Sequence, residues 1–505
     1  MPSYPRLVSD FPVHFDATFV RDLEGLFQPW SGNVLERPRT LVVNEPLAAE
    51  LGIDPDFLWS DRGAEFLSGS RAPEGTLPVA MAYAGHQFGG YSPRLGDGRA
   101  LLVGEFLDRE GRRWDLHLKG SGRTPFARGG DGKAAVGPMM REFVIGEAMH
   151  ALGIPTTRAL AVVSTGENVV RETVLPGAVL ARVAASHIRV GTFQYAASLR
   201  DPDLLRRLAD HSIARHHPLA ADSENLHLAF FESVVERQAR LIARWMLVGF
   251  IHGVMNTDNM TISGETIDYG PCAFMDRYDP ATVFSSIDEG GRYSYGNQPT
   301  IGQWNLARLA ETLLPLLDPT PEVAVEKAMT VLRRYPETHD AAWTSGLRAK
   351  IGLPESTTRP DDERHLLGDL LTLLHANRVD YTSFFRVLGD SLEPRTDATT
   401  IFALRAMFDD GASFDAWLVR WKSALSDNGV DSSAAVELMR RSNPVYVPRN
   451  HRVEEVLAAA TDGDVSPALA LVECLRHPFT GVDACRGLES PAPDGSGPYR
   501  TFCGT

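Results

Sequence analysis

The sequence predicts a mixed α/β fold of the α+β kind, arranged in two lobes with additional segments at both ends. Short strand-like segments and glycine-rich turns are frequent in residues 1–185, with one helical pattern among them. Long amphipathic patterns typical of helices dominate from residue 226 onwards. A chain of 505 residues, 43% hydrophobic, is long enough for two or three packed units. We therefore expect an N-terminal extension and a strand-rich lobe in residues 1–185, the core of a helical lobe in 186–345, and a helical C-terminal extension with the tail in 346–505.

The composition is typical of a soluble globular protein. A formal net charge of −15 argues against non-specific nucleic-acid binding, which needs a basic face. No apolar run reaches the length of a membrane span, and the first residues lack the basic and apolar regions of a signal peptide. The cysteines are too few for a disulfide framework: Cys272, Cys474, Cys485 and Cys503. We expect a cytoplasmic protein with neither a membrane nor a nucleic-acid partner.

A glycine-rich segment, residues 82–104, is the first candidate for phosphate binding. It contains Gly96, Gly98 and Arg99 and leads into the strand-like residues 100–104. Glycines permit positive φ angles and a close backbone approach, which phosphate-binding loops need. The same residues could equally form a hairpin turn that enters the strand, and both interpretations stay open. The segment is not a Walker A motif, because no Gly-Lys-Ser/Thr follows it.

Residues 114–120 alternate in polarity and predict a strand with Lys119 on its polar face, beside Asp115 and His117. The loop that follows, residues 120–133, is rich in glycine and carries two arginines and a lysine. Loops of this length and composition are usually functional or disordered. Cationic side chains among glycines favour an anion site.

The next segment, residues 139–153, predicts an amphipathic helix that ends at Gly153. Glu142 and Glu147 are the candidate partners of Lys119. We prefer Glu142 because it lies in the first turn, soon after the glycine-rich loop. A solvent-exposed carboxylate is the alternative for either residue.

Three strands are predicted after this helix, at residues 159–164, 169–173 and 178–184. Arg182 and Arg189 follow a hydrophobic edge and could reach phosphate by bidentate contacts. As isolated arginines they could equally be surface residues. Helical patterns at residues 226–253 and 304–317, and further ones between 320 and 440, predict the second lobe and the C-terminal extension.

The rest of the chain is organised around residues 251–270. This segment predicts a short hairpin flanked by oxygen donors, with Asp258 and Asn259 before the first strand and Asp268 at the end of the second. The expected strands are residues 260–262 and 266–267. Carboxylate and amide oxygens brought together in this way suit a magnesium ion with nucleotide phosphates.

Protein kinases contain the same arrangement, a His-Arg-Asp loop followed by an Asn, a short hairpin and Asp-Phe-Gly. Here residues 252–259 keep the His-to-Asn spacing, and Asp268-Tyr-Gly270 occupies the position of Asp-Phe-Gly. Val254 occupies the position of the kinase catalytic Asp and cannot accept a proton. Each motif alone could be an ordinary turn. Together they predict a protein-kinase-like two-lobed fold whose nucleotide site does not perform ordinary kinase chemistry.

Seven motifs spread over residues 85–505 resemble one family closely. They are Gly85-His-Gln-Phe-Gly-Gly90, Leu95-Gly-Asp-Gly-Arg99, His117-Leu-Lys-Gly-Ser-Gly-Arg-Thr-Pro-Phe126, Gly129-Gly-Asp-Gly132, His252-Gly-Val-Met-Asn-Thr-Asp-Asn259, Asp268-Tyr-Gly-Pro271 and Thr501-Phe-Cys-Gly-Thr505. This pattern resembles the selenoprotein O family, pseudokinase-fold protein adenylyltransferases. Animal members carry selenocysteine near the C-terminus, where this sequence has Cys503, as in bacterial-type members.

The resemblance implies that the nucleotide is held in an orientation flipped relative to kinases. AMP would pass from ATP to a Ser, Thr or Tyr hydroxyl of a protein, the chain itself included, and pyrophosphate would leave. The resemblance implies that Asp258 is the proton acceptor. It implies that Asn259 and Asp268 bind Mg²⁺, with Mn²⁺ as the alternative ion. Lys119 would bind phosphate and pair with Glu142. The resemblance completes the ATP site with Gly96, Gly98, Arg99, Asp131, Gly132, Arg182, Arg189 and again Asp268.

Two other functions remain open. One is a conventional kinase for proteins or small molecules, with Asp258 as a displaced base. The other is an ATP-binding pseudokinase scaffold without turnover. The retained set Lys119, Asp258, Asn259 and Asp268 argues against this alternative. The resemblance also suggests a redox-sensitive disulfide between Cys272 and Cys503, with an inert tail thiol as the alternative.

Overall fold

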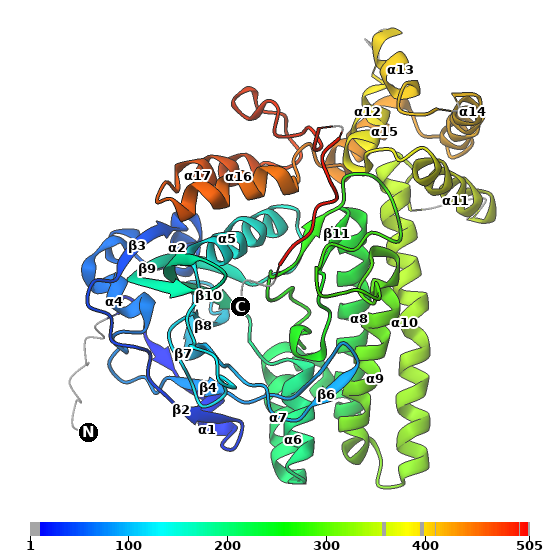
Figure 1. Cartoon of the computed structure of the whole chain (residues 1–505). Helices are drawn as coiled ribbons and strands as arrows, with labels where there is room; N and C mark the ends of the chain where they lie inside the picture. The colour runs from blue at the N-terminus through cyan, green and yellow to red at the C-terminus, as the bar shows by residue number, and fades with distance from the viewer. Residues whose placement is uncertain (1–10, 356–359, 394–397, 410, 494, 503–505) are drawn as a thin grey trace.

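The N-terminal lobe is built on one antiparallel sheet (Figure 1). The computed structural model describes residues 11–355, 360–393, 398–409, 411–493 and 495–502. Within these ranges the sheet has eight strands in the order β2-β4-β7-β8-β10-β9-β3, with β1 paired to β7. The strands are β1 (Phe15–Asp16), β2 (Phe27–Pro29), β3 (Arg39–Val43), β4 (Val79–Met81), β7 (Ala100–Leu107), β8 (Arg113–Lys119), β9 (Arg158–Val170) and β10 (Val174–Ala184).

The N-terminal residues form part of this sheet and are more than a packed extension. β3 pairs with β9 and β2 pairs with β4, so residues 27–43 supply both ends of the strand order. Three short helices follow and cover one face of the sheet: α2 (Glu45–Leu51), α3 (Pro55–Trp59) and α4 (Asp61–Ser68). Leu47 and Leu67 from these helices share a buried apolar cluster with Val163 and Val179 of the sheet.

Two long strands stand where the sequence predicted three. β9 continues to Val170 and β10 begins at Val174, so the predicted separate strand at residues 169–173 is wrong. The pairing of β9 with β10 shifts register beside Gly177, between Pro176 and Ala178. A β-bulge at this point absorbs the irregular residues and lets the pairing continue on both sides.

Helix α5 (Val136–Ala151) covers the opposite face of the sheet. It ends before Gly153, which adopts a φ of +74° and terminates the helix as predicted. α16 (Asn450–Thr461) and α17 (Ser466–Leu475) lie over α5, far from it in sequence (Figure 1). The C-terminal part of the chain therefore braces the helix that carries Glu142.

Long helices form the second lobe, as the sequence predicted. α8 (Leu226–Leu247), α9 (Gln298–Leu317) and α10 (Pro321–Lys350) pack side by side, next to α6 (Val190–Ser198) and α7 (Pro202–His216). α8 ends six residues earlier than predicted, because Gly249 adopts a φ of +75° and a short strand follows. That strand, β11 (Phe250–Ile251), pairs with β12 (Ala273–Phe274) and brackets the loop between them.

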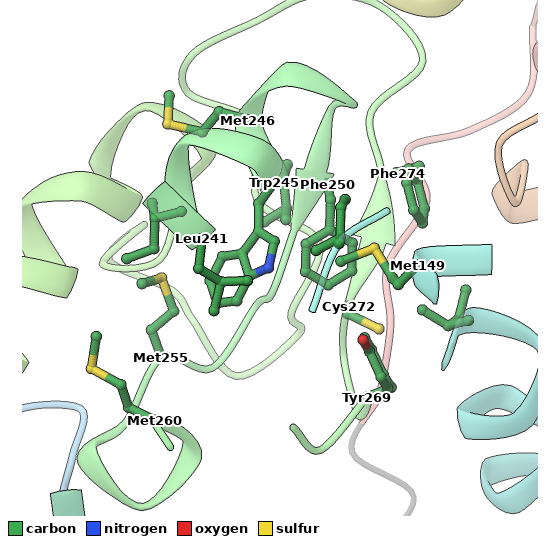
Figure 2. Packing of buried hydrophobic residues seen from close by; sticks show 14 of the residues in the cluster. Met149, Leu241, Trp245, Met246, Phe250, Met255, Met260, Tyr269, Cys272 and Phe274 are labelled. Atoms are coloured by element: carbon green, nitrogen blue, oxygen red, sulfur yellow. The ribbon is translucent and has the colours of Figure 1, made fainter. Parts of the chain in front are cut away.

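A buried cluster of aromatic and sulfur-containing side chains packs against the loop between β11 and β12 (Figure 2). Phe250 lies 5.6 Å from Trp245 and 5.4 Å from Phe274, measured between ring centroids. Tyr269 and Cys272 are buried in the same cluster. Because these rings come from both sides of the loop, the loop has little freedom to move as a whole.

The remaining helices extend the second lobe, and the chain then returns to the centre of the molecule. They are α11 (Pro360–Ala376), α12 (Tyr381–Asp390), α13 (Ala398–Arg405), α14 (Gly411–Asp427) and α15 (Ser432–Ser442). In the tail, Thr501 donates its backbone N–H to Phe284 O (2.8 Å) and its hydroxyl to Pro271 O (2.7 Å). None of the helices in the described ranges combines the length and the hydropathy needed to span a bilayer.

One disulfide, Cys474–Cys485, joins the end of α17 to the segment after it. The sequence predicted no disulfide framework and did not anticipate this pair, because a separation of 11 residues carries no signal of its own in a long chain with few cysteines. Cys503 lies outside the described residues, so its pairing with the buried Cys272 stays a prediction. The division of the chain at residues 185 and 345 also stays a prediction.

We expect Arg449→Ala to lower the free energy of unfolding by about 3–5 kcal/mol, the usual cost of breaking a buried ion pair. The Arg449 side chain is 1% exposed and donates to Asp276 (2.7 Å) and to both oxygens of Asp380 (2.8 and 2.9 Å). Arg452→Ala, which removes a surface pair with Glu455, should cost no more than about 1 kcal/mol. Urea denaturation of both variants would test this, and equal costs would contradict it.

Candidate active site

The loop between β11 and β12 carries the residues that the sequence singled out. His252 donates its Nε2–H to the carbonyl oxygen of Ile267 (2.9 Å), so the two ends of the loop are joined. Asn259 donates its amide to the carbonyl oxygen of Val254 (3.0 Å). This contact leaves the side-chain oxygen of Asn259 available to another partner. Val254, at the kinase base position, is buried.

The predicted hairpin between residues 260–262 and 266–267 is wrong. Thr261 forms an isolated bridge with Arg189, and Thr266 forms a parallel bridge with Thr156. The Thr261 hydroxyl closes the turn by donating to Glu265 O (2.7 Å) and accepting from Glu265 N (3.0 Å). Each half of the segment therefore pairs with a distant part of the chain, and this holds Asp258 and Asp268 as firmly as a hairpin would.

Asp268 lies at the centre of a cluster of cations. Its Oδ1 accepts from Lys119 Nζ (2.8 Å) and from Arg182 Nη1 (2.6 Å), and its Oδ2 accepts a longer contact from Arg189 Nη1 (3.4 Å). Burial opposes ionisation of this carboxyl, but the three positive charges outweigh burial and hold its pKa well below the usual range. Asp268 also adopts a φ of +61°, which is unusual for a residue other than glycine and typical of functional sites.

Lys119 forms an ion pair with Glu142 of α5 as well as with Asp268. Glu147, the other candidate, instead accepts two hydrogen bonds from Arg158 (3.0 and 3.1 Å). The lysine of β8 thus connects the helix α5 to the Asp268 loop, which is the arrangement of an active kinase.

The glycine-rich segment approaches the same cluster. Gly96 adopts a φ of +72°, and a Cβ at this position would lie 2.3 Å from the ring of Phe126. The side chain of Asp97 accepts from Met81 N (3.2 Å) and from His117 Nε2 (3.0 Å). Residues 96–99 do not form a tight turn between neighbouring strands. They form a fixed turn that enters β7 at the rim of a cavity.

A cavity of about 490 Å³ opens between the lobes, a size that suits a small-molecule ligand. All but one of the predicted site residues line it: Gly96, Gly98, Arg99, Lys119, Asp131, Gly132, Arg182, Arg189, Asp258, Asn259 and Asp268. The exception is Glu142, which lies behind Lys119 and lines a neighbouring cavity instead. Asp131 is turned towards Arg171, which binds both of its carboxylate oxygens (2.8 and 3.1 Å).

Asp258 lines this cavity and is 7% exposed. Its Oδ2 accepts from the amide of Gln87 (3.3 Å), whereas its Oδ1 has no hydrogen-bond partner within the described residues. Burial raises the pKa of this carboxyl to about 6, against the opposing charge of Arg189. The approach is close: a Cβ added to Gly85 would lie 2.6 Å from Asp258 Oδ1.

The sequence assigned no role to several residues that hold the site together. Tyr83 places its ring 4.4 Å from the Arg189 guanidinium, and His117 accepts at Nδ1 from Arg182 Nε (3.3 Å). His117 was visible as a polar residue on the same strand face as Lys119. Gln87 lies in the Gly-His-Gln-Phe motif, but only tertiary structure reveals its contact with Asp258.

The fold and the site define a protein of protein-kinase-like fold that places a carboxylate and a cation cluster at an interlobe cavity and has no acid at the kinase base position. The chain belongs to the SelO family: the family model for "Protein adenylyltransferase SelO" matches residues 13–476. The enzyme class expected from the sequence, a nucleotidyltransferase that modifies proteins, is therefore confirmed.

Curated relatives agree over nearly their whole length. A protein of Mycolicibacterium paratuberculosis is 58% identical over 487 residues, which cover 96% of this chain and 97% of the relative. One of Mycolicibacterium smegmatis is 56% identical over 506 residues, 99% of this chain and 100% of the relative. One of Cereibacter sphaeroides is 57% identical over 493 residues, 97% and 99% of the two chains. Each is named protein nucleotidyltransferase YdiU.

We expect Asp258→Asn to stabilise the protein at pH 7.5 by about 1–3 kcal/mol, the order of a two-unit pKa shift. The pKa of this carboxyl is about 6 in the folded state and 3.8 in the unfolded state, so the folded state holds the proton more tightly. The free energy of unfolding of the wild type therefore falls as the pH rises from 3.8 through 6. Asn cannot ionise, so the variant avoids this loss. The difference between variant and wild type should therefore shrink at pH 4.5. Urea denaturation without divalent ions would measure it, and a variant less stable than wild type at pH 7.5 would contradict the account.

Proposed function

We propose that this chain transfers AMP from ATP to Ser, Thr or Tyr hydroxyls of proteins, itself included, in a reaction that depends on Mg²⁺. The observation that carries the proposal is the state of the carboxylates lining the interlobe cavity. Asp97 is bound by His117, Asp131 by Arg171, and Asp268 by its three cations. Among these, Asp258 alone keeps a carboxylate oxygen without a partner, so it is the group available to take a proton.

The cations of the cavity suit the triphosphate of ATP. Lys119, Arg182 and Arg189 converge on Asp268, and the half-buried Arg99 lines the same cavity, where burial lowers the pKa of its guanidinium. Positive groups fixed in a desolvated site stabilise negative charge that develops in a transition state. Here that charge would develop on the pyrophosphate as it leaves.

The residues present fit one hard divalent cation. Asn259 keeps its side-chain oxygen available, and Asp268 Oδ2 is held only by the longer contact with Arg189. An amide oxygen and a carboxylate, completed by phosphate oxygens and water, form the ligand set that Mg²⁺ prefers, and Mn²⁺ accepts the same set. When bound, the ion would neutralise phosphate charge and orient the chain of phosphates.

These positions support the following reaction. The acceptor hydroxyl gives its proton to Asp258 while its oxygen forms a bond to the α-phosphorus. The bond between the α-phosphorus and its bridging oxygen to the β-phosphate breaks, and pyrophosphate leaves with that electron pair. Asp258 is suited to this task, because a carboxyl with a pKa of about 6 is ionised at neutral pH yet more basic than an ordinary Asp.

A conventional kinase with Asp258 as the base and a scaffold without turnover are the competing functions. We expect ATP labelled at the α-phosphate to label the protein or an added acceptor, and ATP labelled at the γ-phosphate to leave both unlabelled. Asp258→Asn should slow the transfer by about 10²–10⁴-fold. Val254→Asp, which restores the acid of kinases, is the matched control and should not produce γ-labelling. Transfer from the γ-position in wild type would establish the kinase, and no transfer from either position would establish the scaffold.

A further inference from the structure

A small hairpin projects from the N-terminal lobe and packs against the loop between β11 and β12, which carries Asp258. It consists of β5 (Gly85–Gln87) and β6 (Gly90–Ser92), which lie between β4 and β7 in sequence but next to α9 in space (Figure 1). His86 donates its N–H to the Thr257 hydroxyl (2.7 Å), and Phe88 donates its N–H to Asn256 Oδ1 (3.1 Å). The hairpin is thus held by the residues directly before Asp258.

This hairpin covers the proposed base. Gln87 binds Asp258 Oδ2, and the backbone of Gly85 closes on Oδ1 so tightly that a Cβ would lie 2.6 Å from that oxygen. A hydroxyl that reaches the Asp258 carboxylate from outside must therefore pass beside the hairpin. The residues of its tip are the first that an acceptor meets.

Phe88 occupies that tip in a strained conformation. Its φ is +50°, a region that favours glycine and asparagine and disfavours a bulky side chain, and Gly89 follows at +85°. The Phe88 ring packs 5.2 Å from Tyr293 at the cavity and remains 39% exposed. Backbone strain of this kind is common at functional sites. It indicates that the Phe88 side chain has a role that a glycine, which fits this backbone conformation without strain, could not fill.

Arg292 lies beside the tip, and its guanidinium is open to a partner from outside. A Cβ on Gly89 would lie 3.7 Å from its guanidinium carbon, and the guanidinium stacks on Trp304 at 4.8 Å. In the described part of the chain no carboxylate forms an ion pair with it, whereas Arg308, on the same Trp304 ring, pairs with Glu311 (2.8 Å). In a protein with a net charge of −15, such a cation is suited to an acidic partner.

The outer edge of β6 is open. His86 and Tyr91 face each other across the hairpin, and the His86 N–H points away from β6 to Thr257. By the alternation of a ladder, the N–H and C=O of Tyr91 point away from β5, and the described residues supply no hydrogen bond to either. Tyr91 is also 47% exposed. An extended polypeptide can add to such an edge.

We propose that the β5–β6 hairpin is the docking element for the acceptor protein, and that it takes an extended segment with an acidic residue close to the modified hydroxyl. The segment pairs with the free edge of β6 at Tyr91, its acidic residue binds Arg292, and Phe88 packs against the acceptor residue as its hydroxyl enters beside Gln87. This proposal rests on the function proposed above, because it names the class of polypeptide that the same site modifies.

The charge preference is tested with synthetic peptides that carry one Ser, Thr or Tyr flanked by aspartates, and with the same peptides flanked by lysines. Transfer from α-labelled ATP should be more efficient for the acidic set by about tenfold in kcat/KM, the usual value of one anchoring contact. Arg292→Ala should remove the preference and Arg292→Glu should reverse it. Arg308→Ala is the matched control on the same tryptophan and should keep the preference.

The two backbone features are tested separately. Phe88→Asn relieves the positive φ, so the variant should melt no lower than wild type, yet its KM for the acidic peptides should rise about tenfold, more than its KM for ATP does. Phe402→Asn, at an exposed site on α13, is the control and should change neither. Tyr91→Pro removes the outward N–H and should raise the peptide KM beyond the effect of Tyr91→Ala, which keeps that N–H.

The outcomes distinguish a failure of the docking site from a failure of the proposed AMP transfer. Wild-type enzyme that modifies acidic and basic peptides equally, or variants at Phe88, Tyr91 and Arg292 with unchanged peptide KM, would overturn the docking site and leave the AMP transfer standing. Self-labelling without transfer to any peptide would also overturn the docking site, because an isolated extended segment should suffice. Loss of α-labelling altogether would overturn the proposed function as well. The shift in melting temperature on adding Mg²⁺ and ATP should be the same in wild type and in the Tyr91 and Arg292 variants, whose side chains do not line the ATP cavity.

Discussion

The site depends on one half-buried carboxylate and the cations around it. Asp268 is held by Lys119 from β8, Arg182 from the neighbouring strand β10, and Arg189 from the start of α6. These contacts join the sheet of the first lobe to the loop of the second, and Glu142 adds α5 to the same cluster. Charges removed from water are stable only when they are paired and well oriented, so each member constrains the positions of the others.

Polar residues behind this cluster fix its geometry. His117 receives Arg182 Nε at its Nδ1 and donates its Nε2–H to Asp97, which anchors the glycine turn. The His117 ring stacks on His187 at 4.2 Å, and burial lowers the pKa of both imidazoles. Of the two rings, His117 contacts Arg182 and, as a neutral acceptor, orients this arginine without competing for Asp268. The cations are fixed before a ligand arrives, which is what electrostatic stabilisation of a leaving pyrophosphate requires.

Local sequence patterns predicted much of this arrangement. Alternation placed Lys119 on the polar face of its strand, and the spacing of Asp258, Asn259 and Asp268 indicated the loop. The structure brings Lys119, Glu142 and Asp268 together from segments far apart in the chain. The failures were of long-range pairing: the expected hairpin after Asn259 gave way to isolated bridges with Thr156 and Arg189, because distant segments of the chain pair with those backbone groups. The contact of Gln87 with Asp258 was missed for the same reason: it joins two distant parts of the chain, and no local pattern relates the two residues.

The central claim is that the nucleotide lies with its α-phosphate, and not its γ-phosphate, towards Asp258. This orientation explains why Asp258 is the available base and why a valine can occupy the kinase base position. The most direct measurement is a structure of the protein with Mg²⁺ and a non-hydrolysable ATP analogue. We expect the α-phosphorus to lie nearer to the Asp258 carboxylate than the γ-phosphorus does, with the β- and γ-phosphates among Lys119, Arg182 and Arg189. A γ-phosphorus beside Asp258, with the α-phosphate remote from it, would contradict the account.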